Sequence, residues 1–253
     1  MHILSYDVAS KSLAVSILYY NDKWKTEIQD LQKQFYDEVK TKKKSLNICR
    51  CVLKYLTKIN KILKNIIFPI FLDVVDLVPN QKVKETTVIL RSARLKSYLN
   101  FMDSYIKNLH ITDSIPVLLE YQMGPNDKSR NVGSQLLYHY SALDFGYKSS
   151  TTETTTPDGA QESKNEAKCI YSVEIVGPTL KNKINLDKPY SFYAAKYVKA
   201  YDANKAHSRD NFIYWMKYID KTDMYKSIKK KNIDDIADSV NMTLAWVFIK
   251  GKK

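Results

Sequence analysis

Four acidic residues are of types and spacing that could do chemistry together: Asp7, Glu120, Asp235 and Asp238. Asp7 interrupts the apolar run "HILSYDV", where a lone carboxylate costs stability unless a positive charge lies against it. Carboxylates that converge from strands and a helix hold hard divalent cations through their oxygens. Two such ions about 4 Å apart activate a water and stabilise the leaving oxygen of a phosphodiester. The four acids therefore predict metal-dependent phosphodiester hydrolysis.

Each acid also has an ordinary structural interpretation. Asp235 follows Asn232 closely and can occupy the first turn of a helix, where acids interact favourably with the helix dipole. Asp238 lies beyond that turn. Glu120 can end a strand and pair with a lysine, and Asp7 can be a turn acid. These alternatives stay open for each residue, but the joint arrangement favours a metal site.

The elements that carry the acids indicate an α/β fold. Short β-rich segments at 2–9 and 12–20 are separated by the turn-like "ASK" and predict an antiparallel hairpin. Asp235 and Asp238 are three residues apart, so on a helix they project from one face. The other expected elements are strands over 69–77, 115–120 and 168–176, and helices over 84–108, 129–143 and 205–250.

Two segments interrupt this order. Residues 22–66 have apolar side chains at helical spacing and lysines on the other faces, which predicts one or two amphipathic helices inserted into the sheet. Residues 148–167 are rich in Ser, Thr and Glu with little to bury, which predicts a mobile loop. Because a strand follows this loop, we expect residues 1–253 to form a single domain.

The composition favours a polyanionic partner. Forty Lys and Arg against 27 Asp and Glu give a net charge of +13, which is typical of proteins that bind nucleic acid or an acidic membrane surface. No apolar segment approaches the roughly 20 residues that span a bilayer, and no signal or transit peptide is visible. The three cysteines cannot all pair and lack zinc-site spacing, which indicates reduced thiols in an intracellular protein.

Four stretches resemble the RuvC branch of the RNase H-like superfamily, and most closely the Holliday junction resolvases of poxviruses and other large DNA viruses. They are "ILSYDVASKSLAVSI", "VLLEYQ", "VEIVGPTLK" and "DDIADSVNMTLAW". They occur in the family's order. The resemblance implies an RNase H-like fold, a mixed five-stranded sheet flanked by helices. It also implies a homodimeric endonuclease that resolves four-way DNA junctions by paired symmetric nicks.

The resemblance implies roles for individual residues. Asp7, Glu120, Asp235 and Asp238 match the family's catalytic metal ligands, which hold two Mg²⁺ ions per active site, with Mn²⁺ as a substitute and no small-molecule cofactor. Lys181 in "GPTLK" matches the lysine that the family has near the scissile phosphate. Lys183 is the alternative counterpart of that lysine.

DNA contacts are expected from Lys11, Met123, Lys128, Arg130 and Lys183. Met123 stands where bacterial relatives often carry an aromatic residue used at the junction centre. A flexible apolar side chain there could still probe unstacked bases. Lys128 and Arg130 belong to the basic run "PNDKSR", which could follow phosphates.

Two other functions stay open at this point. One is another RNase H-like nuclease, which would cut RNA in hybrids or cut flaps. The other is a non-catalytic basic DNA-binding protein whose acids are structural. If the protein is viral, the resemblance implies action in the host cytoplasm, at the site of viral replication.

Overall fold

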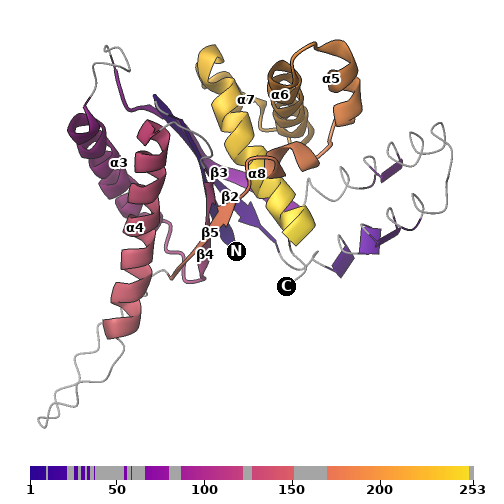
Figure 1. Ribbon diagram of the computed structural model, residues 1–253. Helices are drawn as coiled ribbons and strands as arrows, with labels where there is room; N and C mark the ends of the chain where they lie inside the picture. The colour runs from indigo at the N-terminus through magenta and orange to yellow at the C-terminus, as the bar shows by residue number, and fades with distance from the viewer. Residues whose placement is uncertain are drawn as a thin grey trace, which may run out of the picture.

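The computed structural model describes residues 1–9, 11–21, 66–79, 87–121, 127–150 and 170–250, with scattered residues between 26 and 58. This part of the chain forms a five-stranded sheet in the order β3-β2-β1-β4-β5, with helices on both faces (Figure 1). The mixed α/β sheet predicted from the sequence is therefore confirmed. In the same part of the chain, no helix is long and apolar enough to cross a membrane.

The strands are β1 (His2–Val8), β2 (Ser12–Tyr20), β3 (Ile67–Asp76), β4 (Ile115–Glu120) and β5 (Tyr171–Val176). The first two form the predicted antiparallel hairpin, and β3 pairs antiparallel with β2. β4 lies parallel to β1, and β5 lies parallel to β4. Pro69 lies in β3, an edge strand, where the missing backbone N–H is tolerated.

The helices are α3 (Val88–Asn108), α4 (Asp127–Ser150), α5 (Tyr190–Lys196), α6 (Ala200–Tyr218), α7 (Thr222–Lys226) and α8 (Ile233–Lys250), with 3₁₀ turns η2 (Leu180–Lys183) and η3 (Lys230–Asn232). The helical region expected from 205 onward is thus several elements, and it begins earlier, with α5. The helix expected over 129–143 extends at both ends.

The two predicted insertions are only partly covered by the described residues. Residues 148–150 continue α4, so the loop prediction is wrong for these three residues. The rest of that predicted loop lies outside the described residues. Most of segment 22–66 also lies outside them. The residues described between 26 and 58 are helical, and of these Leu31 and Tyr55 pack against the core.

The sheet buries side chains on both of its faces. Successive residues of β1 point to opposite faces, so they form two alternating sets. Leu4, Tyr6 and Val8 belong to the core under α3 and α4. Ile3 and the residues that alternate with this set face α8 on the other side. Figure 1 shows α3 and α4 together on one side of the sheet, and α8 with α6 on the other. Because both faces are covered there, the inner strands β2, β1 and β4 are nearly continuous runs of buried residues.

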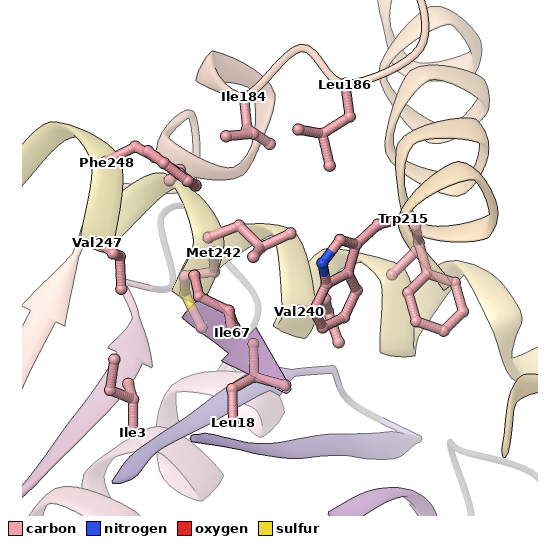
Figure 2. Close-up of a cluster of buried hydrophobic side chains, with 14 of the residues drawn as sticks. Ile3, Leu18, Ile67, Ile184, Leu186, Trp215, Val240, Met242, Val247 and Phe248 are labelled. Carbon is pink, nitrogen blue, oxygen red and sulfur yellow. The ribbon is translucent and has the colours of Figure 1, made fainter. Parts of the chain in front are cut away.

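The core beneath α8 fixes this helix against the sheet. Figure 2 shows Val247 of α8 directed toward Ile3 of the sheet, with Phe248 beside Ile184 on the opposite side of the helix. Trp215 of α6 reaches into the same core and is 1% exposed. α8 is therefore held between the sheet, η2 and α6, which explains why nearly all of its side chains from 236 onward are buried.

A buried hydroxyl cluster sets the register of α8 on the hairpin. Ser5 Oγ lies 2.7 Å from Ser16 Oγ and donates to the Ser239 carbonyl at 2.9 Å. Thr243 Oγ1 donates to Ser5 Oγ at 2.9 Å, and Ser239 Oγ lies 2.9 Å from Ser16 Oγ. Buried polar groups need such partners, so sliding α8 along the sheet would leave several of them unsatisfied.

Candidate active site

Two of the predicted acids meet at the ends of neighbouring parallel strands. β1 and β4 pair with Tyr6 opposite Leu119, so the residues that follow, Asp7 and Glu120, lie side by side. By the two-residue period, both carboxylates lie on the face that packs against α8. The hydrogen-bonded register of the sheet thus brings together two acids that are far apart in the sequence.

The other two acids come from the beginning of α8. Asp238 is 3% exposed, and its Oδ1 accepts a hydrogen bond from Ser208 Oγ at 2.5 Å. Asp235 is less buried, and its Oδ2 accepts from Ser12 Oγ at 2.9 Å. The preceding acid, Asp234, points elsewhere and is paired with Arg209. α8 therefore presents Asp235 and Asp238 to the sheet acids.

Lys181 lies at the centre of these carboxylates. Its Nζ is 3.1 Å from Asp7 Oδ1, 3.0 Å from Glu120 Oε1 and 3.0 Å from Asp238 Oδ2. The side chain comes from η2, the turn that follows β5, and is 16% exposed. Lys183 in the same turn is exposed, and no acid of the described residues pairs with it. Of the two lysines considered from the sequence, the structure brings Lys181 to the acids.

A second lysine, Lys205 of α6, joins the cluster and was missed by sequence reasoning. Its Nζ lies 2.7 Å from Asp238 Oδ2 and 3.8 Å from Asp235 Oδ1. No motif marks it in the sequence, because it is one of 40 basic residues and lies in a helix whose packing the sequence does not reveal. The acids of this cluster therefore face two ammonium groups.

Burial and the close charges shift the pKa values of these groups. Burial by itself lowers the pKa of Lys181, but the carboxylates of Asp7, Asp238 and Glu120 outweigh it and raise that pKa above its usual range. Burial, together with the adjacent Asp7 carboxylate, raises the pKa of Glu120 to about 8. For Asp7 itself, burial is outweighed by Lys181, Glu120 and Lys205, so its pKa is lowered. Of these two neighbouring acids, Asp7 is therefore the one that ionises at the lower pH.

The chemistry of the cluster suits a hard cation. Among the described residues, no three Asp, Glu, His or Cys side chains are arranged so as to hold a metal ion in this state. Instead, three carboxyl groups converge on the ammonium of Lys181, which stands where a positive centre is required. Converging carboxylate oxygens are the ligands that Mg²⁺ and Ca²⁺ prefer. The acids thus fit a divalent cation once the ammonium group of Lys181 has moved out of the centre of the cluster.

A hollow of about 540 Å³ adjoins the cluster at Asp235. Its apolar lining is Leu72, Val74 and Ile228. Lys11, Lys229 and Lys231 are its basic residues, and Asp73, Asp76 and Asp235 are its acidic residues. No acid of the described residues pairs with these three lysines, so their charges are available to a ligand. Of the DNA-contacting residues expected from the sequence, Lys11 therefore lies next to the acids.

The other expected DNA-contacting residues lie elsewhere. Lys128 and Arg130 are in the first turns of α4, and Arg130 forms an ion pair with Asp127. This pair is exposed on the helix surface, so Arg130 is oriented along its own helix. Met123 lies outside the described residues.

The fold and the cluster together define a class of protein. The sheet has three antiparallel strands continued by two parallel ones, with acids on β1, β4 and the last helix, which is the arrangement that the resemblance to RNase H-like domains implies.

A comparison with protein families finds one match. The model of the family described as "Poxvirus A22 protein" matches residues 160–250. This stretch contains Lys181, Asp235 and Asp238, so the resemblance to poxvirus proteins is confirmed over the C-terminal part of the chain.

Curated proteins and solved structures were compared as well. No curated protein matches the chain. A solved structure that is similar to it is the crystal structure of the Fowlpox virus resolvase in complex with its substrate Holliday junction DNA. The two share 18% identity with a TM-score of 0.45, over 98% of this chain and 97% of the other.

Proposed function

We propose that this protein is a divalent-metal-dependent endonuclease that resolves four-way DNA junctions by paired symmetric nicks. The observation that carries the proposal is the convergence of Asp7, Glu120 and Asp238 on one positive centre at the ends of β1, β4 and the first turns of α8. The match of residues 160–250 to the poxvirus family supports the junction as the substrate. Paired nicks require two active sites, so a homodimer is part of the proposal.

The charge distribution supports DNA as the polyanion. The net charge of +13 favours a phosphate backbone, and the lysines around the hollow, Lys11, Lys229 and Lys231, lie beside Asp235. A strand whose phosphates follow these lysines would pass directly over the acids. Such a substrate is met inside the cell, in the compartment where viral or cellular DNA is replicated.

Asp7, Glu120, Asp235 and Asp238 would hold Mg²⁺, with Mn²⁺ as a substitute. When bound, the metal supplies water activation and stabilisation of the leaving oxygen. Ser12 and Ser208 orient the two α8 acids through the hydrogen bonds described above. A bound cation would favour the ionised form of Glu120, whose pKa burial and Asp7 raise. Lys181 would stay charged after leaving the centre of the acids, and a positive charge beside the scissile phosphate favours the negative charge that grows there in the transition state.

The test uses labelled four-way junctions, linear duplexes and RNA–DNA hybrids, each incubated with Mg²⁺ and with a chelator. Selective Mg²⁺-dependent cleavage of junctions into ligatable, 5′-phosphorylated products is expected. Preferred cleavage of hybrids would replace the proposal with another RNase H-like nuclease. Binding without cleavage of any substrate would leave a non-catalytic DNA-binding protein.

The acids are tested one at a time. Asp7→Asn, Glu120→Gln, Asp235→Asn and Asp238→Asn should each abolish cleavage while junction binding is retained, because binding depends mainly on phosphate neutralisation. Asp234→Asn is the matched control, since this acid is on the same helix turn but pairs with Arg209 outside the cluster. Full activity in any of the four variants would remove that residue from the site.

A further inference from the structure

One face of α6 leads from the core to the rim of the acid cluster. Phe212 and Ser208 on this face are both fully buried, and Ser208 donates to Asp238. Lys205, one turn earlier, lies 2.7 Å from the same carboxylate and is 22% exposed. Tyr201 is four residues before Lys205, so its side chain projects from the same face one further turn out. Tyr201 is 68% exposed.

This geometry puts an aromatic ring beside the reaction centre. One helical turn advances about 5.4 Å, so the Tyr201 ring starts about one turn from the lysine that contacts Asp238. A phosphate bound at the acids would bring its flanking nucleotide to this distance. Among the described residues, Tyr201 has no hydrogen bond and no ring contact. Its flat faces are therefore open to a ligand.

The helix presents this ring rigidly, because α6 is fixed on both sides. Opposite Tyr201, Ala203 and Ala206 pack with Tyr193 of α5, whose hydroxyl donates to Asp210 Oδ2 at 2.9 Å. On the α8 side, Asn241 Nδ2 donates to the Ser208 carbonyl at 2.8 Å. Figure 1 shows α6 lying between α5 and α8. A fixed ring loses little conformational entropy when a partner stacks on it.

We propose that Tyr201 is the stacking platform for an unpaired base that flanks the scissile phosphate. The inference rests on the proposed function and specifies how the substrate is recognised. In a continuous duplex, both faces of every base are covered by neighbouring bases, so an exposed ring can stack only on a base that has left the helix. Branch points and distorted steps supply such bases. Tyr201 would therefore favour branched DNA over linear duplex.

The experiment first maps the cleavage position of the wild-type protein on a four-way junction. The nucleotide next to that position is then replaced by an abasic residue or by 2-aminopurine, and binding is measured in chelator for the wild type, Tyr201→Ala and Tyr201→Phe. Tyr138→Ala is the matched control, because Tyr138 is a comparably exposed tyrosine on α4, the other side of the sheet.

We expect Tyr201→Ala to weaken junction binding about ten-fold, the order of magnitude of stacking one base, and linear duplex binding much less. Tyr201→Phe and Tyr138→Ala should stay within about two-fold of the wild type, because the first keeps the ring and the second lies elsewhere. The abasic junction should bind about ten-fold more weakly to the wild type but no more weakly to Tyr201→Ala. Fluorescence of 2-aminopurine should change on binding the wild type and not Tyr201→Ala.

Two results would overturn the inference in distinguishable ways. In the first case, the wild-type protein cleaves junctions, but Tyr201→Ala and the abasic residue either do not weaken junction binding or weaken it independently of each other. Tyr201 is then not the platform, and the proposed function stands. If the wild-type protein cleaves no junction, the proposed function fails, and the inference fails with it. Circular dichroism of each variant verifies the fold, which an exposed side chain should not affect.

Discussion

The ammonium nitrogen of Lys181 lies 3.0 Å from Oδ2 of Asp238, so one positive charge joins the turn after β5 to the last helix. The same nitrogen lies within 3.1 Å of the two acids on the sheet. Lys181 therefore keeps the acids together, and under the proposed function its charge would stay next to the substrate phosphate after a divalent cation has bound.

Lys181→Ala should reduce the cleavage rate more than it reduces affinity. A charge aimed at the developing negative charge contributes on the order of 100-fold in rate, while backbone-following lysines contribute mainly to binding. Single-turnover rates at saturating enzyme measure this difference. Lys183→Ala is the matched control from the same turn and should cleave at the wild-type rate. A wild-type rate for Lys181→Ala would refute the assigned role.

The lysines of the hollow should act in the opposite way. The double change Lys229→Ala with Lys231→Ala should weaken junction binding and reduce the slope of log K against log salt by roughly one per lost phosphate contact. At saturation, the single-turnover rate should be unchanged. Lys217→Ala with Lys221→Ala removes the same charge from the last turn of α6 and the residue before α7, and should leave the slope nearly as it was. Equal slopes for both double variants would exclude the hollow from the DNA path.

Ser5→Ala should lower the free energy of unfolding by about 1–3 kcal/mol, because it removes the acceptor of the buried Thr243 hydroxyl and one of the two partners of Ser16 Oγ. Urea denaturation followed by circular dichroism measures this change. Ser104→Ala removes an exposed hydroxyl that donates to the Asn100 carbonyl, and should change stability by less than about 0.5 kcal/mol. Similar effects of the two changes would mean that the cluster does not set the position of α8.

Stability should fall as the pH is lowered through the range of His207. Burial lowers the pKa of His207 to about 4, and the nearby Asp210 offsets this only in part. Between pH 6.5 and 4 the unfolded chain binds a proton that the folded protein excludes, so stability decreases with falling pH by up to about 3 kcal/mol.

His207→Phe isolates this contribution, because it keeps a ring against Tyr193 and cannot be protonated. Its free energy of unfolding, measured by urea titration at several pH values, should change less steeply than that of the wild type between pH 6.5 and 4. Parallel curves for the two proteins would show that His207 does not titrate in this range.

The strands could be predicted because each is a short apolar run bounded by polar turns, and Asp7 was conspicuous for interrupting one. The breaks among the C-terminal helices could not. α6 ends before Asp220, whose φ of 57° is a left-handed conformation that glycine usually supplies. With no glycine to mark this end, the sequence favoured an uninterrupted helical region.

The candidate site was also predictable only in part. Lys181 and the acids lie in short motifs next to strand or helix ends, where local sequence carries information. Lys205 and Tyr201 owe their position to the packing of α6 between α5 and α8, which depends on side chains far along the chain. No local pattern distinguishes them from other lysines and tyrosines.

The acids come from distant parts of the polypeptide, with Asp7 near one end of the described chain and Asp238 in its last helix. Chains emerge from the ribosome with the N-terminus first, so β1 and β2 exist long before α8 can cover them. During synthesis the nascent chain therefore has an exposed apolar sheet face and only two of the four acids of the cluster. A ribosome that stalls before Ile233 therefore releases a product without Asp235 and Asp238, and under the proposed function such an unfinished copy would not cleave DNA.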